Sequence, residues 1–120
     1  MNDTQRKYLQ REILLSFWKL HILYHAGEEP LLGQWMLEEL RRHGYAVSPG
    51  TLYPILHRME EAGLLSGSTG EGRGSRAPRW YSLTDDGRAL LDEALVQLRE
   101  LSGEIDPAQH RVGKKHGGTA

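Results

Sequence analysis

Cysteine is absent from this 120-residue chain, and no long uncharged apolar run occurs in it. Without cysteine, the fold cannot depend on disulfides, and thiolate nucleophiles and cysteine-ligated zinc sites are excluded. The N-terminal segment MNDTQRKYLQRE is polar and has no small-residue cleavage site, and the apolar stretch after it is interrupted by Lys19 and His21. These absences predict a cytoplasmic protein with no membrane segment.

The chain also lacks an excess of charge and lacks the common catalytic motifs. Its formal net charge is −1, so composition alone does not indicate nucleic-acid binding, and any such function must depend on local charge. Neither HExxH nor GxSxG occurs, and the stretch GEGRGS lacks the lysine and the following helix of a phosphate-binding loop. The sequence therefore predicts that the protein is not an enzyme.

Hydrophobic residues recur at helical spacing over residues 5–26, 31–43 and 48–62. Gly27 and Pro30 are expected to end the first helix, Gly44 the second and Gly63 the third. The first helix has an apolar surface wider than one small domain covers, which indicates contact with another chain. The predicted inward residues are Leu32, Trp35, Met36, Leu37 and Leu40 in the second helix and Leu52, Ile55, Leu56 and Met59 in the third, with Glu38, Glu39, Arg41 and Arg42 outward.

Two short strands are expected at 64–68 and 79–83, joined by a glycine- and arginine-rich stretch. Thr84 then caps a fourth helix. The predicted fold is mainly α with a small two-stranded β wing, a winged helix-turn-helix followed by a C-terminal dimerisation helix. The expected divisions are a DNA-binding domain with its N-terminal helix at 1–83, a dimerisation helix at 84–102 and a disordered tail at 103–120. Leu91, Leu95 and Leu98 lie at helical spacing with no later element to cover them, which favours dimerisation through this face.

In such a fold the third helix enters the major groove, and its exposed residues contact bases and phosphates. Ser48 offers an N-cap hydroxyl, and Pro54 predicts a tightened or 3₁₀-like start. The stretch from Ser68 to Trp80 holds three arginines and one acid, a local net charge of +2. The candidate DNA-binding residues are Ser48, Thr51, Tyr53, Pro54, His57 and Arg58 on the helix, and Arg73, Arg76 and Arg79 in the wing.

The segments SPGTLYPILHRMEEAGLL and PRWYSLTDDGRALL resemble the PadR family of bacterial regulators over about residues 13–98. The resemblance includes the element from Gly50 to Pro54, the Gly63-Leu64 pair, and Tyr81, Leu83, Thr84 and Gly87 after the wing. It implies a cytoplasmic homodimer that binds a palindromic operator in double-stranded DNA, commonly as a repressor released by an effector. The single C-terminal helix resembles the shorter subfamily, in which that helix packs with the first helix of the partner chain.

The effector remains open at this stage, between a small aromatic molecule and a metal ion. Phe17, Trp18, His21 and Tyr24 are the expected lining of an effector cavity at the dimer contact. His21 and His25, at spacing i, i+4, could instead share a divalent metal, completed by Glu28, Glu29 or a histidine of the partner chain. No cofactor is certain. Two rival functions are a metal-sensing regulator that uses this pair and a protein-binding winged helix that never contacts DNA.

Overall fold

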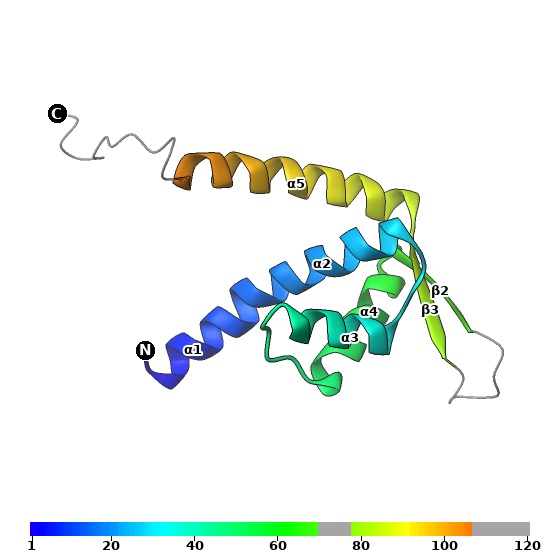
Figure 1. Cartoon of the computed structure of the whole chain (residues 1–120), viewed down its shortest axis with the longest axis horizontal. Helices are drawn as coiled ribbons and strands as arrows, with labels where there is room; N and C mark the ends of the chain where they lie inside the picture. The colour runs from blue at the N-terminus through cyan, green and yellow to red at the C-terminus, as the bar shows by residue number, and fades with distance from the viewer. Residues whose placement is uncertain (70–77, 107–120) are drawn as a thin grey trace.

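The computed structural model describes residues 1–69 and 78–106 and consists of helices with a small sheet at one end (Figure 1). A continuous helical rod forms the N-terminal part, with α-helical ends and a π-helical middle. Two shorter helices follow, and a long helix closes the described chain. The helical elements are α1 (Asp3–Tyr8), η1 (Leu9–Leu14), α2 (Leu15–Glu28), α3 (Gly33–Arg42), α4 (Pro49–Glu61) and α5 (Asp85–Ile105). The strands are β1 (Leu31–Leu32), β2 (Leu65–Thr69) and β3 (Arg79–Leu83).

The sheet has three antiparallel strands in the order β1-β3-β2. β2 and β3 form the predicted hairpin, with Leu65 opposite Leu83 and Thr69 opposite Arg79. The short strand β1 adds to the other edge of β3 through Leu31 and Leu32. The assignment of these two residues to the second helix was wrong, because pairing with β3 holds them extended and α3 begins only at Gly33.

Two glycines and one threonine determine helix ends, as predicted. Gly44 and Gly63 adopt left-handed φ angles of 95° and 80°, which close α3 and α4. The Thr84 hydroxyl accepts a hydrogen bond of 2.9 Å from the Gly87 amide and caps α5. Gly27 does not end the first helix, which continues to Glu28. A Cβ at Gly27 would lie 2.8 Å from Leu83 Cδ2, so this glycine permits close helix packing.

The core lies where α2, α3, α4, the sheet and the start of α5 meet. Leu52, Ile55, Leu56 and Met59 are buried along one face of α4, as predicted. Two predictions for α3 were wrong: Trp35 is exposed and Glu39 is buried. The Trp35 ring contacts His25, and the Glu39 carboxylate bonds Arg42 and His43. Helical spacing alone does not show these contacts. Within residues 1–69 and 78–106, no helix has the length and apolarity needed to cross a membrane.

Gly87, in the first turn of α5, packs directly against the turn that follows α4. A Cβ there would lie 2.2 Å from the Leu64 carbonyl oxygen, a backbone atom that cannot turn away. We expect Gly87→Ala to lower the free energy of unfolding by at least about 2 kcal/mol, because the helix must shift. Gly50→Ala is the matched control, since the nearest atom to its added Cβ is Ser48 Oγ at 3.9 Å. Urea denaturation of both variants checks this, and equal stabilities would contradict it.

Candidate nucleic-acid interface

α3 and α4 form the helix-turn-helix, and hydrogen bonds from the backbone and from Arg41 hold the turn between them. The Tyr45 amide donates to the Leu40 carbonyl at 3.1 Å, and Arg41 Nε donates to the Val47 carbonyl at 3.1 Å. Val47 is itself buried. The chain therefore enters α4 in a fixed direction. Sequence reasoning placed Arg41 simply outward, because nothing in the local pattern shows its reach to the turn.

The predicted contact residues of α4 all lie on its exposed side: Ser48, Thr51, Tyr53, Pro54, His57 and Arg58. Ser48 occupies the N-cap position, although its hydroxyl bonds Thr51 Oγ1 at 3.2 Å instead of a backbone amide. The Thr51 hydroxyl accepts from Ser48 and lies on the exposed side, so it is the group at this helix start that can donate to a phosphate oxygen. Of the tightened start predicted for this helix, the structure has one hydrogen bond, from the Thr51 amide to the Ser48 carbonyl at 3.0 Å. The helix is otherwise α-helical through Pro54.

Tyr53 owes its position to a glycine that sequence reasoning missed. A Cβ at Gly33 would lie 2.9 Å from Tyr53 Cε1, so the ring packs directly over the start of α3. The other side of the ring is open, and 42% of the residue is exposed. Gly33, Tyr53, Pro78 and Arg79 are among the residues that line a surface hollow of about 390 Å³ between α4 and the wing. The Tyr53 side chain is therefore held rigidly at the edge of the candidate interface.

His57 and Arg58 lie in the middle of α4 and differ in their partners. His57 Nε2 is 3.4 Å from Glu61 Oε2, a contact between two well-exposed side chains that solvent screens. Arg58 is exposed, and it borders a second hollow between α2, α4 and α5. His57 therefore stays accessible on the exposed side of α4, whereas Arg58 borders the side that faces α2 and α5.

The base of the wing is fixed to α4 by an ion pair that the sequence did not reveal. Arg79 Nε donates to Glu60 Oε1 at 3.1 Å, and Arg79 Nη2 bonds the second carboxylate oxygen. These bonds lower the pKa of Glu60 and raise that of Arg79. Arg79 thus has an acidic partner within the protein and links the base of the wing to α4. Arg73 and Arg76, the other two wing candidates, lie outside the described residues.

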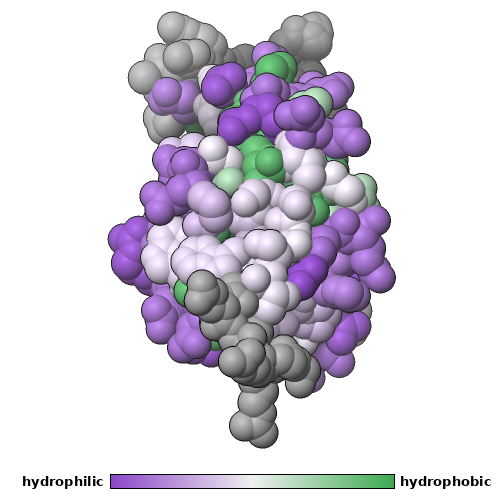
Figure 2. Space-filling model, turned by 90° about the vertical axis from the view of Figure 1, so that its right-hand side faces the viewer, coloured by the Kyte–Doolittle hydropathy of each residue, from purple (hydrophilic) through white to green (hydrophobic). Residues whose placement is uncertain are grey.

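Viewed from the end formed by the sheet, the surface around the wing is mainly hydrophilic or intermediate in hydropathy (Figure 2). Hydrophobic residues show there only as small patches among the described residues. A surface of this kind is typical of one that contacts a polar, hydrated partner.

The four residues predicted to line an effector cavity have different environments within one chain. Trp18 is buried, with its ring edge against Tyr45 at a centroid distance of 6.1 Å. His21 turns to the same side and packs against His43 and Tyr45. Phe17 and Tyr24 are exposed. Because the predicted cavity lies between this helix and the fourth helix of a partner chain, it stays a prediction.

The three leucines proposed for dimerisation also have different environments. Leu91 is buried in the core of its own chain, Leu95 packs partly against that core, and Leu98 is exposed. Four exposed apolar residues of α5 form a stripe that continues beyond the predicted end of the helix: Leu90, Leu98, Leu101 and Ile105. Of the three predicted residues, Leu98 alone is exposed in the single chain, and dimerisation through α5 stays a prediction.

Helix-turn-helix, hairpin wing and long closing helix together define a winged-helix transcriptional regulator. Residues 22–93 match the transcriptional regulator PadR-like family, and the chain belongs to that family. The chain is 48% identical to the transcriptional regulator Rv3488 of Mycobacterium tuberculosis over 104 residues, which cover 86% of this chain and 96% of the relative. The family is one of regulators and not of enzymes.

Solved structures with the same fold include other regulators of this kind. A PadR-like transcriptional regulator from Bacillus cereus superposes with a TM-score of 0.71 at 25% identity, covering 84% of this chain and 99% of the other. A PadR family regulator from Eggerthella lenta gives a TM-score of 0.66 at 25% identity, covering 91% and 99%. The predicted fold class is thereby confirmed, with the third strand added.

Proposed function

We propose that the chain acts in the cytoplasm as a homodimeric repressor, which binds a palindromic operator through α4 and the wing and is released by an effector. The observation that carries this proposal is the exposed face of α4. Six side chains with donors or flat surfaces lie there, while the opposite face is anchored by four buried residues. Such a rigid helix with a polar outer face suits the major groove.

In the proposed dimer a two-fold axis relates the two chains, which matches the two halves of a palindromic operator. The long helices form the contact surface between the chains. α2 and α5 diverge from the end of the molecule near the sheet (Figure 1), and their apolar residues remain exposed. Phe17 and Tyr24 on the rod and Leu98 and Leu101 on α5 are among them. An isologous dimer would bury these stripes against each other and present two copies of α4 to successive half-sites.

The experiment that tests the proposal is footprinting of the region upstream of the protein's own gene, followed by fluorescence anisotropy on the protected duplex and on a scrambled one. A protected two-fold repeat and an operator affinity at least about 10³-fold above that for scrambled DNA are expected. Absence of binding to any duplex at low salt would favour the rival function, a winged helix that binds protein.

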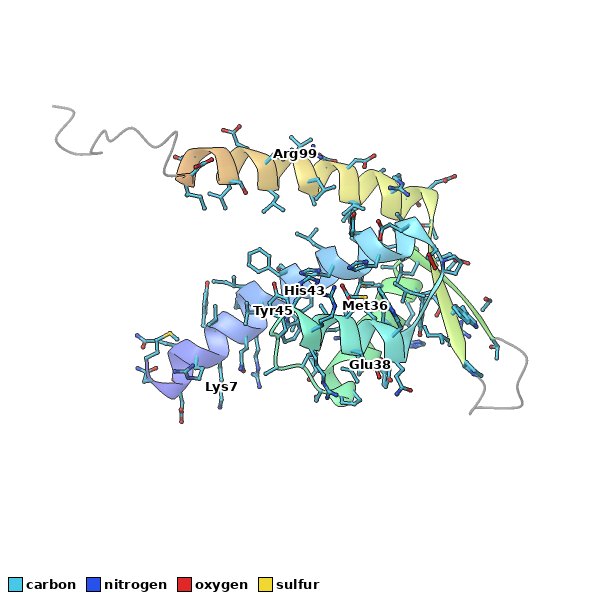
Figure 3. The ribbon with its side chains drawn as sticks, viewed as in Figure 1. Lys7, Met36, Glu38, His43, Tyr45 and Arg99 are labelled. Atoms are coloured by element: carbon cyan, nitrogen blue, oxygen red, sulfur yellow. The ribbon has the colours of Figure 1, made fainter. Side chains whose placement is uncertain are left out.

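The wing arginines provide a prediction about salt. Arg73→Ala and Arg76→Ala should each weaken binding to operator and scrambled DNA alike, and should each reduce the slope of log affinity against log salt by about one unit, because one phosphate contact is lost. Arg99→Ala on α5 (Figure 3) is the matched control and should leave the slope unchanged. Slopes equal to that of the wild-type protein in both wing variants would exclude phosphate contacts there.

A further inference from the structure

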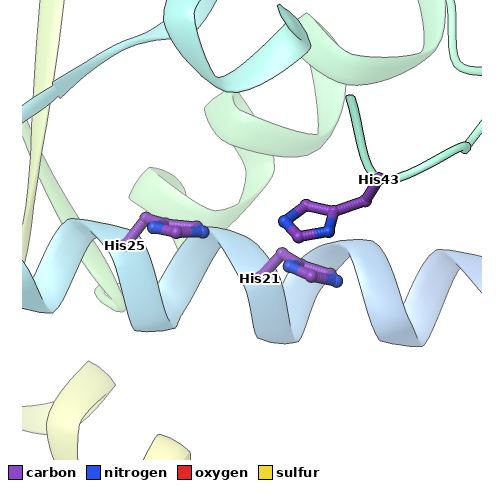
Figure 4. A group of neighbouring side chains, drawn as sticks. All are labelled: His21, His25 and His43. Atoms are coloured by element: carbon purple, nitrogen blue, oxygen red, sulfur yellow. The ribbon is translucent and has the colours of Figure 1, made fainter. Parts of the chain in front are cut away.

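Three histidines from two elements lie together beneath the helix-turn-helix. His21 and His25 project from the same side of α2, and His43 reaches toward them from the end of α3 (Figure 4). One nitrogen from each ring lies within 4.8 Å of the others. The sequence indicated the first two as a pair, but His43 follows 18 residues later and only the fold brings it to them. Figure 3 shows His43 and Tyr45 beside α2.

The buried carboxylate of Glu39 orients two of these rings. Glu39 Oε2 is 3.0 Å from His43 Nε2 and 3.5 Å from His25 Nε2, and Arg42 Nη2 donates to the same oxygen at 2.8 Å. The hydrogen bond from Arg42 is the main reason that the pKa of Glu39 falls to about 2. The carboxylate is therefore ionised and remains an acceptor for imidazole at any ordinary pH. Carboxylate–histidine pairs of this kind fix the rings of metal-ligating histidines.

Burial and the two neighbouring histidines lower the pKa of His21. Its neutral form, which is the form that binds metals, is thereby favoured. Three protonated imidazoles in this space would repel one another, whereas three neutral ones present lone pairs. Nearby charges are Glu28, with Oε1 at 3.4 Å from His25 Nδ1, and the Glu39–Arg42 pair described above.

We propose that His21, His25 and His43 form a binding site for a divalent transition metal ion of the Zn²⁺ class. Imidazole is a preferred ligand of Zn²⁺, Co²⁺, Ni²⁺ and Cu²⁺, and three protein nitrogens leave a fourth position open. In a tetrahedral zinc site, bonds of about 2.0–2.1 Å place ligand nitrogens about 3.4 Å apart, so the rings need only turn slightly inward. His25 and Glu39 also line a surface hollow of about 460 Å³, which gives the ion a path from solvent.

A metal at this position would connect the long rod to the helix-turn-helix. His43 is the C-cap residue of α3, and the turn that follows it leads directly into α4. Drawing His43 toward α2 therefore moves the start of α4 relative to the rod that carries the exposed dimer stripe. The regulatory role of the metal rests on the proposed function: there, the metal is the effector that releases the operator.

Metal binding is tested on the full chain without a histidine tag, by Co²⁺ absorption in the visible range and by Zn²⁺ calorimetry. The wild-type protein is expected to bind one ion per chain with the spectrum of a low-coordinate cobalt site. His43→Asn should reduce the affinity at least about tenfold, and because His43 is partly exposed at a helix end where asparagine is tolerated, its melting temperature without metal should not change. His110→Asn with His116→Asn is the matched control and should bind as the wild-type protein does.

The variant Glu39→Gln tests whether the ionised Glu39 carboxylate positions the histidine rings. It keeps the size of the side chain and removes the ionised acceptor, so Co²⁺ affinity should fall about 10- to 100-fold while cobalt retains its three nitrogen ligands. A wild-type protein that binds no Co²⁺ or Zn²⁺, or that binds equally well after His43→Asn, would overturn the site. Loss of binding in the His110, His116 control would assign the ion to those residues and would also overturn it.

Operator anisotropy with and without Zn²⁺ tests the regulatory step separately. Zn²⁺ should weaken operator binding by about 5- to 150-fold in the wild-type protein and have no effect in His43→Asn. By linkage, the operator complex should bind Zn²⁺ more weakly by the same factor. If an operator is bound and its affinity does not fall with Zn²⁺, the effector role is wrong although the metal site stands. If no operator is bound, the proposed function fails, and the cobalt titration still decides the site.

Discussion

Tyr53→Ala combined with His57→Ala is expected to reduce operator affinity by at least about 2 kcal/mol, with a smaller loss on scrambled DNA. Tyr53 is held over Gly33 with its outer side open, and His57 lies one turn further along the exposed face of α4. Side chains fixed on a rigid helix can read or position bases, so their loss affects the specific complex most. Fluorescence anisotropy on the two duplexes measures the difference.

The matched variant is Tyr53→Phe, which keeps the ring over Gly33 and removes the hydroxyl alone. A loss close to that of Tyr53→Ala would assign the contribution to a hydrogen bond, and a small loss would assign it to the ring. Because the Tyr53 ring packs on Gly33, the double variant is expected to lose some stability, and circular dichroism must show that it is folded under the conditions of the binding assay. Full operator affinity in that variant would overturn the proposed surface.

Local signals in the sequence were sufficient for the ends of α3 and α4, for the start of α5 and for the buried face of α4. Gly44, Gly63 and Thr84 act within a few residues of their own positions, so a single sequence contains their whole effect. The apolar spacing of Leu52, Ile55 and their neighbours works in the same way. These features fixed the order of helices and hairpin, and hence the fold class.

Contacts between distant segments could not be predicted in this way. Strand β1 exists because β3 pairs with it about 50 residues later. The Glu60–Arg79 bond joins two elements that no local pattern relates. His43 completes the histidine cluster only after α3 has folded back along α2. The candidate site was therefore predicted as a list of exposed residues, while its supports came from tertiary structure.

Leu98→Glu combined with Leu101→Glu is expected to convert the proposed dimer into a folded monomer. The two leucines are 37% and 52% exposed in the single chain, so glutamate at either position is solvated in the monomer. In an interface it would be a buried, unpaired charge, which costs several kcal/mol. Leu91 and Leu95 are unsuitable for this test, because they pack against the core of their own chain and their replacement would unfold it.

Sedimentation velocity and circular dichroism together measure this outcome. The double variant should sediment as a monomer with unchanged helix content, and Gln97→Glu, which adds charge at an exposed polar position of α5, should remain dimeric. Operator affinity should fall steeply in the monomer, because each half-site is then bound alone and the second contact loses its effective concentration. A dimer that persists with Leu98→Glu and Leu101→Glu would show that α5 does not form the interface, and the palindromic operator would then need another explanation.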